Sequence, residues 1–513
     1  MAQGVLPYQF EAETQPTVLT GLAGLLVYLD LAQVVGLRDS ILLHVQARIG
    51  SQGWTDAQML TTLILLNLAG GECVEDLEKL QNDEGFALIL HRCETFGLPR
   101  PERREQERRF RKSTERKVPS VSAMRRFLAS FHVPTEESKR EPGKAFIPAR
   151  SSALTGLSRV NADLLAFLQR RAPETTATLD MDATLVETQK KDALFCYKKF
   201  RAYQPLNVWW AEQETVVHSE FRDGNVPAGF EQLRLLKESL ALLPEGVKTV
   251  SLRSDSAGYQ WDLMRYCAEG KRERFGAIEF AVSADVTEAF RKAVRRVAEA
   301  DWKPLRRRFG DRWMDTGQEW AEVCFVPIEA ARKKTGPSYR FLAIREPLAQ
   351  LEIEELETDQ KDLPFPTISY KDQGPSSRFK LFGVVTNRHD VSGDELIWWH
   401  RERCGKSEEA HAVMKSDLAG GRLPSRMFGA NAAWWGAMIL ALNLNTLMKR
   451  LVLGGSWVTK RLKAIRYWFI NLPGRLVRHA RQLKLRLSAG HRSLQLLIDA
   501  RSAIAALAVG PSG

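Results

Sequence analysis

Two aspartates inside a strand-like segment place the strongest constraint on how this chain folds. Residues 178–184 read Thr-Leu-Asp-Met-Asp-Ala-Thr, and their polar and apolar residues alternate as on an extended strand with one polar face. Asp180 and Asp182 share that face. An ionised carboxylate on a core strand is tolerated mainly when it is hydrogen-bonded, paired or bound to a metal ion. The alternative is a half-exposed edge strand with two surface carboxylates.

Length and charge limit the class of protein. A chain of 513 residues is too long for one hydrophobic core, and the usual domain size suggests about three or four domains. Hydrophobic residues make up 44% and charged residues 27%, which excludes a fibrous or disordered chain. The net charge of +12 predicts local basic surfaces that attract phosphate backbones or anionic membranes.

The sequence predicts a cytoplasmic protein without a membrane span. Its first residues lack the basic region and the apolar run of a signal peptide. The most apolar stretch, residues 430–448, contains three asparagines and is expected to form a buried helix. The six cysteines lie far apart without zinc-finger spacing, as expected in a reducing compartment.

Residues 1–150 are expected to form a helical DNA-binding region with a basic linker. Leucines recur with helical spacing up to about residue 95, and residues 100–117 are dense in charge. Ser120 or Ser122 is then expected to cap a short helix that exposes Arg125 and Arg126. Helices of that kind commonly lie on DNA, although a charged run alone is more often a solvated surface.

Residues 151–290 change from helical to alternating patterns and predict the first part of an α/β core. Strands are expected at residues 178–184, 194–203, 206–210 and 214–221, followed by alternating helices and strands. The fold class is therefore α/β, in an α+β multidomain arrangement.

The rest of the chain divides into three parts. Residues 291–395 are expected to form a β-rich insertion, which contains an acidic, proline-containing connection at residues 352–366. Residues 396–450 return to helices and complete the core. Residues 451–513 form a basic C-terminal region in which aromatic residues lie among the Arg and Lys residues, a composition that suits a phosphate backbone.

Three acidic residues from separate segments have the chemistry of a metal site. Asp182 lies on the first strand, Asp255 follows a strand at residues 248–254, and Glu408 lies on an expected helix. Their carboxylate oxygens suit Mg²⁺ or Mn²⁺, and two such ions can activate an attacking water or 3′ hydroxyl on a phosphodiester. Glu408 and Lys415 share one helical face, so a plain ion pair is the alternative for that segment.

Taken together, these segments are similar to a known family. The residues that carry the similarity are 69–71, 74–77, 119–120, 179–184, 203–206, 253–259 and 404–418. Through them, the chain from about residue 17 to about residue 490 resembles the DDE transposases of bacterial insertion sequences, specifically insertion-sequence family thirteen-eighty.

The resemblance implies an RNase H-like catalytic core that the β-rich insertion interrupts. It implies that Asp182, Asp255 and Glu408 are the catalytic metal ligands, with Mg²⁺ as the cofactor and Mn²⁺ as a substitute. Asp180 and Glu409 are weaker alternatives as ligands, because each lies close to a matched position.

The signature around the last acid departs from the family pattern. Arg403 and Lys415 match its basic residues, but the tyrosine position holds Trp399 or His400. One extra residue also separates Arg403 from Glu408.

The resemblance further implies a cut-and-paste transposase that cleaves terminal inverted repeats and transfers the strands to target DNA. A homodimer in a synaptic complex, associated with the bacterial nucleoid, is the expected state. The expected DNA-binding residues are Arg125, Arg126, Arg253, Arg403 and Lys415. The alternatives are a non-catalytic DNA-binding protein derived from a transposase and a plain RNase H-like nuclease.

Overall fold

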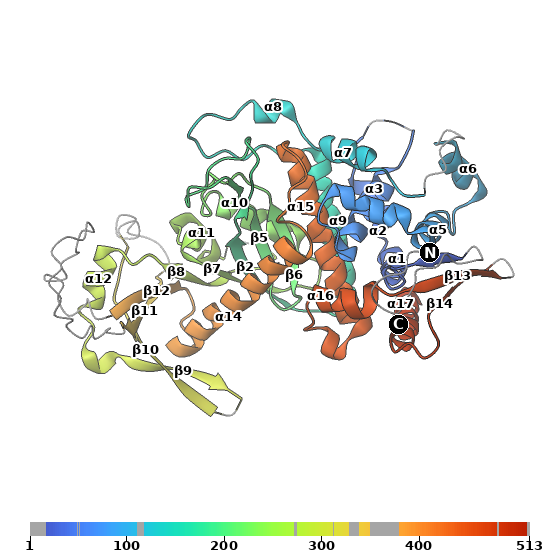
Figure 1. The fold of residues 1–513 in the computed structure, drawn as a ribbon. Coiled ribbons are helices and arrows are strands. Elements are labelled where there is room, and N and C mark those ends of the chain that lie inside the picture. Colours follow the sequence, from blue (N-terminus) through green and yellow to red (C-terminus); the bar gives the residue numbers. More distant parts are fainter. Residues whose placement is uncertain are drawn as a thin grey trace, which may run out of the picture.

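A computed structural model of the chain combines one large mixed sheet with an extensive helical body (Figure 1). The N-terminal helices and the C-terminal segments lie side by side in that body, and the sheet extends away from it. The structure describes residues 17–48, 50, 52–109, 117–270, 274–310, 312–327, 338–348, 379–479 and 482–509.

The large sheet contains nine strands among the described residues, in the order β6-β5-β2-β7-β8-β12-β11-β10-β9. β2, β7 and β8 are parallel to one another, and the remaining neighbours pair antiparallel. The strands are β2 (Thr176–Ala183), β5 (Leu206–Trp210), β6 (Thr215–Glu220), β7 (Thr249–Ser254), β8 (Glu279–Ala284), β9 (Lys303–Phe309), β10 (Arg312–Glu322), β11 (Arg340–Pro347) and β12 (Phe379–Thr386).

β2 is a central strand that is covered on both faces. Leu179 and Met181 pack into a core with α10 (Gln232–Leu242) and α11 (Trp261–Ala268). The opposite face, which carries Asp180, lies against α14 (Gly393–Ala412). The polar face predicted from the sequence is therefore buried beneath a helix.

The strands of the predicted insertion continue this sheet. β12 pairs with β8 from Gly383 to Thr386, and β11, β10 and β9 follow outward. Pairing with β12 satisfies backbone groups that β8 would otherwise leave open at a sheet edge. The basic helix α12 (Glu288–Val294) precedes these strands, and the acidic connection at residues 352–366 lies outside the described residues.

The helical body is organised around α15 (Phe428–Leu447), which packs against α9, α3, α7 and β6. α3 begins with a capping box between Thr55 and Gln58 and ends at Gly70, whose φ of 93° suits glycine. The bounds of the helices just named and of the remaining ones are α1 (Leu25–Val34), α2 (Leu37–His44), α3 (Asp56–Ala69), α4 (Leu77–Asn82), α5 (Glu84–Glu94), α6 (Arg100–Arg108), α7 (Val121–Ala129), α8 (Pro134–Glu137), α9 (Ser152–Arg171), α16 (Leu462–Ile465) and α17 (Ser493–Val509).

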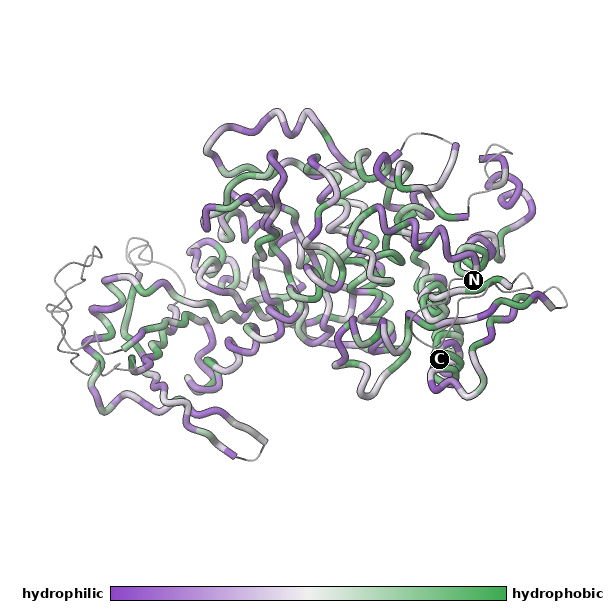
Figure 2. The backbone as a smooth tube through the Cα atoms, in the orientation of Figure 1, coloured by the Kyte–Doolittle hydropathy of each residue, from purple (hydrophilic) through white to green (hydrophobic). Residues whose placement is uncertain are grey.

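Phe428–Leu453 is long and apolar enough to cross a membrane by length and composition, but 67% of its most apolar window is buried in the protein. Its asparagines bond inside the protein: Asn443 Nδ2 donates to Asn161 Oδ1 at 2.6 Å, and Asn445 Oδ1 accepts from the Tyr28 hydroxyl at 2.7 Å. Burial and internal hydrogen bonds mark α15 as a core helix. Figure 2 shows the same trend, with hydrophobic residues along α15 and the central strands.

Two small sheets complete the fold. β1 (Val18–Thr20), β13 (Gly474–His479) and β14 (Gln482–Arg486) form one sheet in the order β1-β13-β14. β3 (Val186–Glu187) pairs with β4 (Ala202–Tyr203). The predicted strand over residues 194–203 is wrong for most of its length, because the chain turns at Lys199, where φ is 65°.

Candidate active site

Asp182 and Asp255 lie side by side at the carboxyl ends of two parallel strands. β2 and β7 are adjacent, and Met181 is opposite Ser254 in the register, so each aspartate is the next residue along its strand. The Asp182 side chain is 22% exposed and Asp255 is half-buried, so both carboxylates reach the sheet edge. In α/β sheets this edge is where ligands commonly bind.

The electrostatics of Asp255 reflect its neighbour. Burial raises the pKa of the Asp255 carboxyl, the charge of Asp182 raises it further, and the guanidinium of Arg403 opposes the shift. Asp255 Oδ1 also accepts a hydrogen bond from the Ala257 amide at 3.0 Å, which fixes the turn after β7. Two adjacent carboxylates that repel each other form a site that a cation would stabilise.

Arg403 extends from α14 to the first of these aspartates. Its Nη1 lies 3.3 Å from Asp182 Oδ2, and the side chain is only 9% exposed. Its Nε is buried without a hydrogen-bond partner among the described residues. In this structure the guanidinium therefore faces the acidic pair, where it compensates part of the negative charge.

A buried ion pair lies directly beneath the site. Arg253 donates to Asp180 through Nε at 2.6 Å and through Nη2 at 2.9 Å, and both side chains are about 1–2% exposed. Burial raises the pKa of Asp180, and the hydrogen bonds from Arg253 oppose that shift. This bidentate geometry is strong and directional.

The same guanidinium also bonds to α14. Arg253 Nη1 donates to the Trp399 carbonyl at 2.7 Å and to Glu402 Oε2 at 3.0 Å. Arg253 was expected to bind DNA, but its burial and its internal acceptors give it a structural role. Asp180, the alternative metal ligand, is engaged in the same pair.

Two histidines of α14 flank the aspartates. His400 Nε2 lies 3.0 Å from the Ser254 carbonyl, and burial lowers the pKa of His400 to about 4, so a neutral ring donates this bond. His411 Nε2 lies 3.4 Å from Asn207 Nδ2. Burial lowers the pKa of His411, and the charges of Asp182 and Glu408 oppose that shift.

Asn207 is a site residue that the sequence analysis missed. It lies on β5 directly opposite Asp182, and its side chain is almost fully buried. Its Oδ1 accepts a hydrogen bond from Ser219 Oγ at 2.7 Å. An asparagine within the otherwise apolar segment Leu206–Trp210 was the available signal.

Glu408 and Glu409 are both exposed on α14. The charge of Glu408 acts on His411, whereas that of Glu409 acts on Lys449 and Arg461. Lys415, in the π-helical turn after α14, is half-buried and lowers the pKa of His411.

Within the part of the chain that the structure describes, no three His, Cys, Asp or Glu residues are grouped to hold a metal ion. Glu408 is thus not gathered with the two aspartates. Mg²⁺ is usually bound by one or two carboxylates, with water and substrate phosphates as the other ligands. The pair of Asp182 and Asp255 offers that donor set.

α7 presents the two arginines expected to bind DNA. Ser120 caps the helix, since its Oγ accepts a hydrogen bond from the Ala123 amide at 3.3 Å. Arg125 and Arg126 are exposed on its surface, and Arg125 pairs with Glu75.

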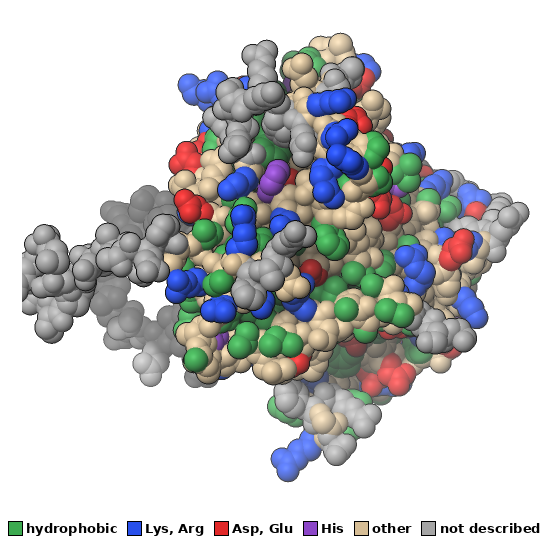
Figure 3. Space-filling model, turned by 90° about the vertical axis from the view of Figure 1, so that its right-hand side faces the viewer, with side chains coloured by type: hydrophobic (Ala, Val, Ile, Leu, Met, Phe, Trp, Pro, Cys, Tyr) green, Lys and Arg blue, Asp and Glu red, His purple; other side chains and the backbone are tan. Residues whose placement is uncertain are grey.

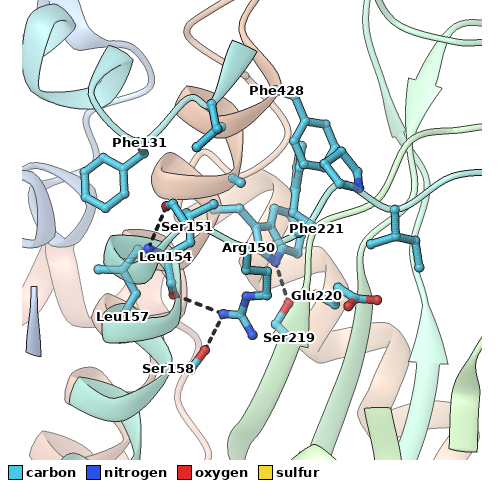
Figure 4. A pocket seen from close by; sticks show the side chains of 18 of the residues that line it. Phe131, Arg150, Ser151, Leu154, Leu157, Ser158, Ser219, Glu220, Phe221 and Phe428 are labelled. Carbon is cyan, nitrogen blue, oxygen red and sulfur yellow. Dashed lines mark hydrogen bonds between the residues drawn. The ribbon is translucent and has the colours of Figure 1, made fainter. Parts of the chain in front are cut away.

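A pocket lies between α9, β6 and α15, two strands from β2 (Figure 4). Arg150 points into it and donates through Nη2 to the Leu154 carbonyl at 3.0 Å and to Ser158 Oγ at 2.5 Å. Its internal volume of about 60 Å³ is too small for a nucleotide. This pocket is therefore a small cavity in the core whose lining is mostly apolar.

Comparison with known proteins gives a family match along the sequence and several matches among solved structures. The model of the family described as "Transposase DDE domain group 1" matches residues 7–509. The cryo-EM structure of a piggyBac transposase synaptic complex with hairpin DNA aligns with a TM-score of 0.36 and 10% sequence identity, over 87% of this chain and 79% of that chain. No curated protein matches the chain.

Proposed function

This chain belongs to the transposases with a DDE domain of group 1, and from that premise we propose that it cleaves the ends of a mobile element and joins them to target DNA. The observation that carries the proposal is the adjacency of Asp182 and Asp255 at the carboxyl edge of β2 and β7. Cut-and-paste transposition of an insertion sequence, with cleavage at terminal inverted repeats, is the specific reaction we propose.

We assign Asp182 and Asp255 as the ligands of a divalent cation, Mg²⁺ with Mn²⁺ as a substitute. Glu408 is the proposed third acid, since its charge and that of Asp182 both raise the pKa of His411. A bound cation would activate the attacking oxygen and stabilise the leaving oxygen of a phosphodiester. Arg403 and Asn207 would hold Asp182 in position from two sides.

Strand order supports an RNase H-like core. The antiparallel meander β6-β5-β2 continues into the parallel strands β7 and β8. Asp182 lies near the end of β2, the first of these strands along the chain, and Asp255 follows β7, the fourth. The proposed divisions are 1–150 for end binding, 151–290 and 396–450 for the core, 291–395 for the insertion and 451–513 for the basic C-terminal region. Membership of family thirteen-eighty is part of the proposal.

The proposed partners are the terminal inverted repeats and target DNA, bound by a homodimer in a synaptic complex in the bacterial nucleoid. Exposure supports Arg125 and Arg126 as phosphate contacts. Lys415 and Arg403 lie closer to the acidic pair, where a scissile phosphate would be held.

A joined-product assay tests this function. A labelled duplex that carries the element end is incubated with supercoiled target DNA and Mg²⁺, and cut and joined products are separated. Wild type should form both, while Asp255→Asn should form neither and still bind the end. Cut ends that are never joined would assign a nuclease, and binding without any cleavage would assign a non-catalytic DNA-binding protein.

A further inference from the structure

The hairpin β13–β14 is a projecting two-stranded ribbon. β1 pairs only with Gly474, Arg475 and Leu476, whereas β14 pairs with β13 over its whole length. Beyond Leu476 the two strands therefore have only each other as partners in this sheet. Figure 1 shows the hairpin extending away from the helical body.

The register places Leu476, Leu483 and Leu485 on one face of this ribbon, where Arg478 also lies, and Arg475, Lys484 and Arg486 on the other, where Val477 also lies. Leu476 is opposite Leu485, and both pack toward the core. On the other face Arg475 is opposite Arg486, and Lys484 follows on the same side because alternate residues share a face. All three basic side chains are exposed.

On the basic face, two arginines lie directly opposite each other. Like charges directly opposite each other on a sheet are destabilising. Among the described residues, no ion pair involves Arg475, Lys484 or Arg486. Asp83 lines the recess at the base of the hairpin with both arginines, but its carboxylate accepts hydrogen bonds from Thr20, Gly21 and Phe86.

Shape and charge together identify a partner. A two-stranded ribbon fits the major groove of B-DNA, and basic side chains at its surface contact phosphates. Figure 3 views the molecule from the end that carries the hairpin and shows Lys and Arg side chains on that surface.

We infer that the β13–β14 hairpin is a DNA-binding ribbon, which holds the phosphate backbone of duplex DNA through Arg475, Lys484 and Arg486. This inference rests on the proposed function and gives it a surface that is separate from the acidic pair. The contacts are electrostatic and independent of base sequence, so they contribute to affinity and to its salt dependence.

The test measures binding of a short labelled duplex by fluorescence anisotropy over a series of salt concentrations. The variant Arg475→Gln/Lys484→Gln/Arg486→Gln should bind at least about tenfold more weakly near 0.1 M salt. The slope of log affinity against log salt should fall by about 2 to 3 in magnitude, since each phosphate contact contributes about 0.9. The variant Arg475→Lys/Arg486→Lys should keep the wild-type slope.

The matched control is Lys139→Gln/Lys144→Gln/Lys237→Gln, which removes three exposed positive charges elsewhere; Lys139 and Lys144 are already paired with acids. Equal slopes for the hairpin variant and this control would overturn the inference. So would wild-type binding of polyglutamate as tight as that of the duplex, because the ribbon would then be a general polyanion or acidic-protein site.

Cleavage by the wild type separates the two proposals. If the hairpin variant loses DNA affinity but the wild type cuts no DNA, the proposed function is wrong and the inference that the hairpin binds DNA is supported. If the wild type cuts the element end while the hairpin variant binds DNA like the control variant, only the inference that the hairpin binds DNA is wrong.

Discussion

At the scale of single residues, the site depends on how the polar side chains around Asp182 and Asp255 are held. The strand pattern indicated acidic residues at positions 180, 182 and 255, and the choice of Asp182 over Asp180 came from the family resemblance. It did not predict that Arg253 would bind Asp180 or that Arg403 would face Asp182. Those contacts depend on the parallel register of β2 and β7 and on the position of α14, which no local pattern encodes.

Breaking the buried pair should destabilise the fold. Asp180→Asn leaves the Arg253 guanidinium buried without its carboxylate partner, and removal of one partner from a buried pair costs about 3–5 kcal/mol in free energy of unfolding. Urea denaturation followed by circular dichroism measures the loss.

Glu402→Gln is the matched control, because the Glu402 side chain is 64% exposed where it bonds to the same guanidinium. Its effect should stay below about 1 kcal/mol. A loss for Asp180→Asn no larger than that of the control would show that the pair does not hold the strands together.

Glu94 should give the stability a pH dependence. Burial raises the pKa of Glu94 to about 7, although Gln58 donates a hydrogen bond to it at 2.9 Å. A carboxyl whose folded pKa is raised stabilises the fold below its unfolded pKa, and that contribution is lost as the pH rises through about 7. The thermal midpoint should therefore fall between pH 5 and pH 8, and less so in Glu94→Gln.

Glu78→Gln, at an exposed position on α4, controls for the loss of one acidic residue. An identical pH profile for Glu94→Gln and the wild type would contradict the assignment of the shift to Glu94.

At the scale of elements, the local pattern predicted β5 from a mostly apolar segment that only Asn207 interrupts. β5 has the predicted bounds, whereas the strand predicted at residues 194–203 is mostly a turn. Residues in that segment form two isolated bridges, Phe195 with Arg201 and Tyr203 with Asp223, so the alternation was misleading. Close contacts between distant elements were also invisible in the sequence.

One such contact joins α1 to the C-terminal segment. A Cβ added at Gly24 would lie 1.5 Å from the Phe469 carbonyl oxygen, so Gly24→Ala should force the two backbones apart and cost roughly 1–3 kcal/mol or more. Gly405 on α14 has open space around it, and Gly405→Ala should stabilise the protein by up to about 1 kcal/mol. Chemical denaturation of both variants measures the difference, and equal midpoints would contradict this packing.

At the scale of the whole molecule, late segments of the chain pack against early ones in two places. The C-terminal segments complete the body begun by the N-terminal helices, and β12 brings residues 379–386 back to the core sheet before α14 crosses the site. The sequence predicted the change of pattern at residue 291. It did not predict a continuous sheet, because strand pairing at an edge depends on backbone hydrogen bonds that any sequence can make.

The central claim is that Asp182 and Asp255 form the catalytic acidic pair. Cleavage of a labelled duplex with the element's end, in the presence of Mg²⁺, tests it most directly when wild type is compared with Asp182→Asn, Asp255→Asn, Glu408→Gln and Glu409→Gln. The account predicts that the first three variants lose cleavage by about 100-fold or more while they still bind the end, and that Glu409→Gln cuts like the wild type. Cleavage at the wild-type rate by Asp182→Asn or Asp255→Asn would contradict it.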